Sequence, residues 1–176
     1  MIVPQGFRAL RRADEFWEKF AQGIWEPVTV RVIDTLLAPG STHIDVGAWV
    51  GPTVLLAATK AKRVLAFEPD PVAYAELEKD VALNPDLARR VELRQEALFD
   101  REGEMRMVDG GPSTSGALVM PLLTPEGCTG VLSAEMKGGS ERDESSQALA
   151  TIFAAQLATL VTPPVAAVQA KATAHA

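Results

Sequence analysis

The spacing of apolar residues along the chain changes from a helical period to short runs. Residues 5–20 and 28–37 carry apolar side chains three or four positions apart, which predicts two amphipathic helices. Residues 42–46, 64–67 and 91–94 have the length and the flanking residues of strands. The middle one is a continuous apolar run between charges, as expected of a buried parallel strand.

Helical patterns over residues 52–61 and 71–83 separate these strands. Alternating strands and helices joined by short loops predict a parallel sheet covered by helices, with right-handed crossovers. The fold class that we expect is therefore α/β.

The C-terminal part has a different pattern. Residues 104–108, 117–123 and 128–136 have the composition of strands, and residues 142–161 have the most regular helical period in the chain. The large apolar residues of that helix are Leu149, Ile152, Phe153, Leu157, Leu160 and Val161. The tail after Pro163 and Pro164 is rich in alanine and is expected to be disordered.

These changes of pattern divide the chain into four parts. We expect N-terminal helices over 1–40, a cofactor-binding sheet over 41–123, a strand and helix over 124–162, and a disordered tail over 163–176.

Composition narrows the function classes. The chain has 176 residues, of which 47% are hydrophobic, and its net charge is −6. A negative net charge argues against nucleic acid and anionic membranes as partners. The single cysteine, Cys128, cannot form an internal disulfide, so a cytoplasmic protein is expected. Two distant histidines and one cysteine predict no metal site.

Candidate chemistry lies where the first parallel strand ends. Asp45 and Gly47 are followed by Ala48, Trp49 and Gly51, and a helix begins directly after them. Ligands of open α/β sheets bind at the carboxyl ends of the strands. Gly47 would let the backbone approach a ligand, Gly51 would allow close packing at the helix start, and Asp45 could hold an ammonium group directly or through water.

The next strand ends in Glu68, 21 residues after Gly47 and followed by Pro69 and Asp70. An acidic residue at this position accepts hydrogen bonds from both ribose hydroxyls of an adenosine cofactor. After the third strand, Glu96 and Ala97 are placed to meet the adenine edge. In the alternative interpretation, the glycines only shape a turn and Glu68 only caps a helix.

The loop also discriminates between adenosine ligands. Dinucleotide sites usually carry three glycines around a pyrophosphate, whereas the middle glycine is missing here beside Trp49. Asp45 would repel a pyrophosphate. Both features favour S-adenosylmethionine, which has an ammonium group and no phosphate.

Residues 16–108 resemble the FkbM family of S-adenosylmethionine-dependent methyltransferases. The resemblance rests on Phe16-Trp17, on residues 23–29 and 43–52, on residues 66–71, and on Asn84. It implies an incomplete Rossmann-like, class I methyltransferase sheet and methylation of oxygen, often on sugar hydroxyls. It also implies that Asp45, Gly47 and Gly51 hold the amino-acid moiety of the cofactor and that Glu68 holds its ribose.

The resemblance stops before the strand that carries part of the substrate face in that family. Only residues 131–137 are loosely similar to that strand, whose place would be beside residues 42–46 on the side opposite 64–67. Residues 127–161 instead resemble the C-terminal strand and helix of a GAF sensory domain, through residues 130–136 and 154–157.

Three functions therefore compete. The first is an O-methyltransferase acting on a small-molecule or sugar hydroxyl, for which no catalytic base can be named. The second is a module that binds S-adenosylmethionine without turnover. The third is a GAF-like sensory or dimerisation fragment, with a homodimer formed through residues 142–161.

Overall fold

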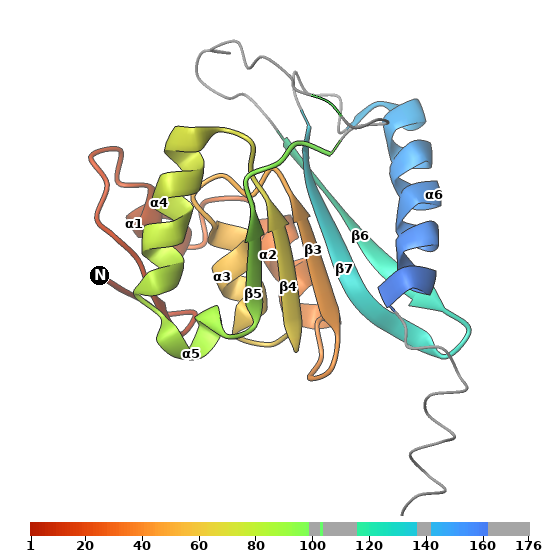
Figure 1. The fold of residues 1–176 in the computed structure, drawn as a ribbon, viewed down its shortest axis with the longest axis horizontal. Coiled ribbons are helices and arrows are strands. Elements are labelled where there is room, and N and C mark those ends of the chain that lie inside the picture. Colours follow the sequence, from red (N-terminus) through yellow and green to blue (C-terminus); the bar gives the residue numbers. More distant parts are fainter. Residues whose placement is uncertain (99–102, 104–115, 137–141, 162–176) are drawn as a thin grey trace, which may run out of the picture.

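The computed structural model describes residues 1–98, 103, 116–136 and 142–161 (Figure 1). The strand expected over 104–108 and the tail over 163–176 lie outside these residues. The elements, in order, are β1 (Ile2–Val3), β2 (Phe7–Arg8), α1 (Phe16–Ala21), α2 (Pro27–Leu36), β3 (Thr42–Val46), α3 (Pro52–Ala58), β4 (Arg63–Phe67), α4 (Pro71–Ala82), α5 (Pro85–Ala88), β5 (Val91–Arg94), β6 (Gly116–Thr124), β7 (Gly127–Met136) and α6 (Glu144–Val161).

The main sheet has the strand order β5-β4-β3-β7-β6. The first four of these strands run parallel, and β6 is antiparallel to β7. Asp45 on β3 is paired with Ala66 of β4 on one side and with Ser133 of β7 on the other. This arrangement confirms the predicted α/β class with an incomplete Rossmann-like sheet. It also shows that β7 occupies the place beside β3 where the family strand was expected.

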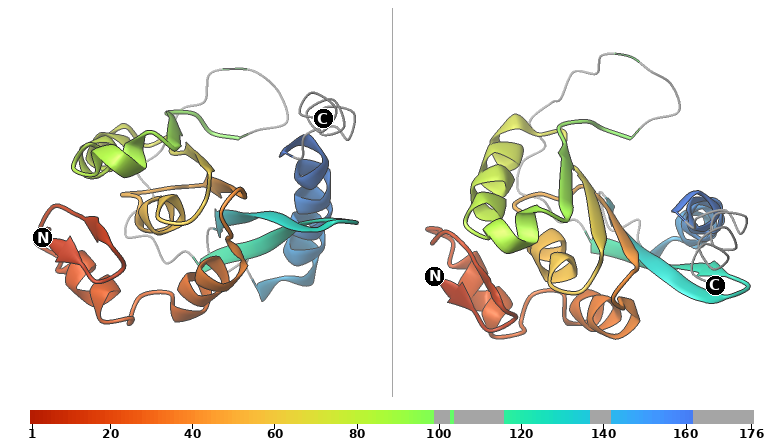
Figure 2. Two further views of the ribbon diagram at one scale, coloured as in Figure 1. Left: turned by 90° about the horizontal axis from the view of Figure 1, so that it is seen from below. Right: turned by 60° about the horizontal axis from the view of Figure 1, so that its bottom comes forward.

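Helices cover the two faces of the sheet unequally. A large apolar cluster packs α1, α2, α3 and α4 against one face, where the sheet contributes Val64, Ala66 and Val131. A smaller cluster packs α6 against the other face, with Ile44, Leu122 and Leu132 from the sheet. In both views of Figure 2, α1 and α6 accordingly lie on opposite sides of the molecule.

The predicted helix over residues 5–20 is wrong in its first two thirds. Residues 1–9 form the β1–β2 hairpin, which turns at Gly6 with a φ of 96°, and the helix α1 begins only at Phe16. The backbone N–H groups of Arg8 and Leu10 donate to Asn84 and Asp80. These side chains at the end of α4 accept hydrogen bonds from backbone N–H groups that a helix would have bonded internally. The extended conformation of residues 7–10 is stabilised for this reason.

Helix α6 confirms its predicted bounds to within two residues, but most of its large apolar residues do not form the buried side. Ala154 and Ala158 are buried, whereas Leu149, Ile152, Phe153 and Leu160 are exposed. Small residues let the helix approach β6 and β7 closely, and the period of the large residues does not reveal this. Among the described residues, no helix combines the length and apolarity that a membrane span requires.

The contact between β3 and β7 yields the first prediction. Gly130 has no Cβ, and a Cβ built on it would lie 1.9 Å from the carbonyl oxygen of Thr42. We therefore expect Gly130→Ala to push the two central strands apart and to lower the free energy of unfolding by about 2–4 kcal/mol, measured by urea denaturation.

Gly103→Ala is the matched control, because nothing lies within 4 Å of the Cβ it would gain. We expect it to change the free energy of unfolding by less than about 0.5 kcal/mol. Equal stability of the two variants would show that β7 does not pair with β3 in this register.

Candidate cofactor-binding site

The loop between β3 and α3 has an unusual backbone. Gly47, Trp49 and Gly51 all have positive φ values, of 80°, 48° and 89°. A Cβ on Gly51 would lie 2.5 Å from Cδ1 of Leu77 in α4, which confirms that Gly51 permits close packing at the helix start. Trp49 is not a glycine, so its conformation costs about 1–2 kcal/mol and must be held by its surroundings.

The end of β4 holds this loop in place. The N–H groups of Gly47 and Ala48 both donate to the carbonyl oxygen of Phe67, at 2.9 Å. The next N–H, of Trp49, donates to Oε2 of Glu68 at 2.7 Å. Three consecutive backbone donors of the loop are thus bound by Phe67, the last residue of β4, and by Glu68, which follows it.

Glu68 joins two loops at the carboxyl edge of the sheet. Its Oε2 accepts from Trp49, its Oε1 accepts from the N–H of Asp70 at 2.8 Å, and the residue is buried. The N-terminus of α4 is capped by Asp70, which accepts from Val72 and Ala73, so capping is not the role of Glu68.

Asp45 points into the molecule, toward α3 and β7. Its Oδ1 accepts from Oγ of Ser133 at 2.9 Å, and its Oδ2 accepts from Oγ1 of Thr53. Nε2 of His43 lies 3.4 Å from Oδ2 of Asp45 and 3.2 Å from Oγ of Ser133. The structure therefore places Asp45 in a buried polar cluster directly below the loop.

Sequence reasoning missed Thr53 and Ser133. Thr53 is the second residue of α3, where the helix start could have suggested it. Ser133 comes from a strand 88 residues further along the chain, and only the pairing of β7 with β3 brings it to Asp45. His43 belongs to the same cluster, is fully buried, and has no partner for Nδ1 among the described residues.

The ring of Trp49 packs against the N-terminal segment. It meets Phe16 edge-on at a centroid distance of 4.6 Å, and the guanidinium of Arg12 lies 5.2 Å from its centroid. Phe16 in turn contacts Trp17 and Trp25, so Trp49 joins an aromatic cluster. These contacts supply the support that the strained Trp49 backbone requires.

The third strand ends at the same edge of the sheet. The N–H of Glu68 donates to the carbonyl oxygen of Arg94 at 3.0 Å, so the ends of β4 and β5 are side by side. Glu96 and Ala97 follow this point and are exposed. The sequence-predicted residues thus come from three neighbouring strand ends, with Asp45 below them and Glu96 and Ala97 beyond the last pairing.

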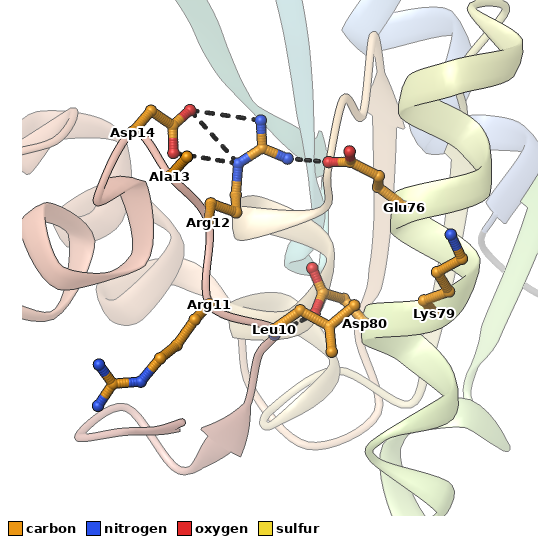
Figure 3. Close-up of a pocket in the computed structure, with 8 residues that line it drawn as sticks. All are labelled: Leu10, Arg11, Arg12, Ala13, Asp14, Glu76, Lys79 and Asp80. Atoms are coloured by element: carbon orange, nitrogen blue, oxygen red, sulfur yellow. Dashed lines mark hydrogen bonds and ion pairs between the residues drawn. The ribbon is translucent and has the colours of Figure 1, made fainter.

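A separate pocket of about 450 Å³ lies between the N-terminal segment and α4 (Figure 3). Its lining consists of Leu10, Arg11, Arg12, Ala13, Asp14, Glu76, Lys79 and Asp80. Figure 3 shows Arg12 bridging Asp14 and Glu76 across it. Burial raises the pKa of Asp80, partly offset by the N–H of Leu10. None of the sequence-predicted site residues lines this pocket.

Comparisons with known proteins find matches among solved structures. No protein-family model and no curated protein matches the chain, so neither the FkbM nor the GAF resemblance gains support there. Trm5b from Pyrococcus abyssi is 31% identical over 38% of this chain and 19% of its own, with a TM-score of 0.34. The tRNA m1G37 methyltransferase of M. jannaschii is 24% identical over 39% of this chain and 22% of its own, with a TM-score of 0.34.

A third structure, from Streptococcus mutans, was solved in complex with SAH. It is 18% identical over 40% of this chain and 39% of its own, with a TM-score of 0.38. The chain therefore spans less than half the length of each of these three proteins. Its strand order and glycine loop define a Rossmann-like α/β protein.

The comparisons correct one prediction. A tRNA methyltransferase among the matching structures contradicts the expectation of a small-molecule acceptor and no nucleic-acid partner. The expectation of no nucleic-acid partner rested on the net charge of −6, and a net charge does not say where the charges lie on the surface. The small-molecule acceptor was implied only by the FkbM resemblance.

The buried cluster around Asp45 yields the second prediction. Ser133→Ala removes a buried hydroxyl and leaves Oδ1 of Asp45 without that donor. We expect the free energy of unfolding to fall by about 1–3 kcal/mol, measured by urea denaturation. Ser145→Ala, at an exposed position of α6, is the control and should change it by less than about 0.5 kcal/mol. A Ser133→Ala protein as stable as its control would rule out the hydrogen bond to Asp45.

Proposed function

We propose that this chain binds S-adenosylmethionine at the β3–α3 loop, as the cofactor-binding part of a class I methyltransferase. The observation that carries the proposal is the hydrogen bond from Trp49 N–H to Glu68, which joins a glycine loop to an acidic strand end at the carboxyl edge of the sheet. The residues proposed to surround the cofactor are Asp45, Gly47, Ala48, Trp49, Gly51, Glu68, Pro69, Asp70, Glu96 and Ala97.

The hydrogen bonding of the loop supports this cofactor over a dinucleotide. A pyrophosphate needs several free backbone N–H groups, whereas those of Gly47, Ala48 and Trp49 are bound by Phe67 and Glu68. Asp45 and Glu68 also place two carboxylates beside the loop, which suits a cationic amino acid and ribose hydroxyls better than phosphates.

Each residue has a distinct part in the proposal. Glu68 accepts hydrogen bonds from the ribose hydroxyls at the carboxyl edge of the sheet. Asp45 is turned inward by Thr53 and Ser133, so it acts on the ammonium group through the loop or through water. Bound there, the cofactor supplies an electrophilic methyl group.

A second candidate function is binding without methyl transfer. It is favoured by the engagement of both carboxylates near the loop, since Asp45 and Glu68 already accept hydrogen bonds from protein donors. A carboxylate in this state is a poor general base. Transfer of radiolabelled methyl to RNA or to other acceptors would favour the enzyme, whereas binding without transfer would favour the module.

Calorimetry tests the cofactor claim. We expect the full chain to bind S-adenosylmethionine and its demethylated product, and not NAD. Glu68→Ala should weaken binding of S-adenosylmethionine at least tenfold, about 1.4 kcal/mol, because the ribose loses its acceptor. The matched control is Glu78→Ala at an exposed position of α4, which should leave the affinity unchanged.

Glu68 also ties down the loop, so urea denaturation must show that the variant is folded. Glu68→Gln is a second variant that keeps one oxygen and most of the packing. Its affinity for S-adenosylmethionine should lie between those of Glu68→Ala and the wild-type chain. Absence of binding at millimolar S-adenosylmethionine, or equal affinity of Glu68→Ala and the wild-type chain, would overturn the proposal.

A further inference from the structure

A second concave surface lies at the opposite edge of the sheet from the cofactor loop. It has a volume of about 310 Å³ and forms where β4 and β5 begin. The starts of these strands lie near α5 (Figure 1). Its lining consists of Lys62, Arg63, Arg89, Arg90, Val91 and Glu92. Segments that are far apart in the sequence meet here because the N–H of Val64 donates to the carbonyl oxygen of Arg90 at 2.7 Å.

The lining is strongly positive in a chain whose net charge is −6. Four cationic side chains surround one carboxylate, Glu92. Arg63 donates to Glu92 at 2.7 Å, and hydrogen bonds from Arg63 and Arg94 lower the pKa of Glu92, so this carboxyl group stays ionised. Glu92 and Asp86, which pairs with Arg89 at 3.4 Å, do not balance the four cations, so the concavity keeps a local excess of positive charge.

Two of the four cations are held in place. Nη1 of Arg90 donates to the carbonyl oxygens of Ala58 and Ala61, at 3.2 and 3.4 Å, where α3 ends. Arg63 is held by Glu92. Lys62 and Arg89 are exposed side chains beside these anchored guanidinium groups. Anchored arginines lose little conformational freedom when they bind an anion, and their planar donors match phosphate oxygens.

We propose that this concavity binds the phosphate groups of a nucleic-acid backbone. Its volume exceeds that of one phosphate, and its cations come from two separate segments, which fits successive phosphates better than a single free ion. The lining contains no exposed large apolar side chain, which a membrane-inserting surface would need. The proposal goes beyond the cofactor site and does not depend on it, since none of the residues is shared.

Fluorescence anisotropy of the full chain with a labelled single-stranded RNA of about 20 nucleotides tests the proposal over a range of salt concentrations. The test variant is Lys62→Glu with Arg89→Glu. The control is Arg11→Glu with Arg31→Glu, two exposed positions outside the concavity whose reversal changes the net charge equally.

We expect the test variant to bind RNA at least tenfold more weakly than the wild type, and the control to stay within about threefold. The slope of log affinity against log salt should shrink by about 1.4 in the test variant, because about 0.7 is lost for each phosphate contact. If the charge reversals unfold the chain, Lys62→Gln with Arg89→Gln gives the same comparison with a smaller loss of RNA affinity.

Four results would overturn the proposal. They are absence of RNA binding by the wild-type chain, equal losses in the test and control variants, displacement of RNA by inorganic phosphate at equal phosphate concentration, and binding of phosphatidylserine vesicles, in place of RNA, that depends on Lys62 and Arg89. The third would assign a small-anion site, and the fourth a lipid surface.

Discussion

The structure of the candidate site depends on the hydrogen bonds between the end of β4 and the loop after β3. Phe67 and Glu68 accept hydrogen bonds from the N–H groups of Gly47, Ala48 and Trp49. These bonds fix a loop in which Gly47, Trp49 and Gly51 have positive φ values. Without them, the positive φ of Trp49 would be unsupported. The same carboxylate that is proposed to hold a ribose therefore also builds the loop that would hold the rest of the cofactor.

Strand β3 connects the loop to the centre of the sheet. It is paired on both sides, with β4 and with β7, and Asp45 at its carboxyl end is locked by Thr53 and Ser133. Above the loop, Arg12 and Phe16 cover the ring of Trp49. The loop is thus held by strand ends, by the buried polar cluster below it and by an aromatic segment from the N-terminus.

Local patterns predicted the parts of the fold that are decided locally. The alternating strands and helices over residues 42–94 follow from period, prolines and glycines, and they placed Gly51 and Glu68 correctly at strand and helix ends. Contacts distant in sequence could not be predicted in this way. The partner of Asp45 lies on β7, the hairpin over residues 1–9 is stabilised by side chains at the end of α4, and the basic concavity forms only when β4 and β5 pair.

The most direct test of the cofactor site is the mapping of amide chemical shifts in the full chain as S-adenosylmethionine is added. A cofactor at the carboxyl edge of the sheet predicts amide shifts that saturate together at residues 47–51, at Glu68 and Asp70, and at residues 96–97. Residues lining the pocket beside α4 should change little. Shifts confined to Arg11, Lys79 and their neighbours in that pocket, or no saturable shifts at all, would contradict it.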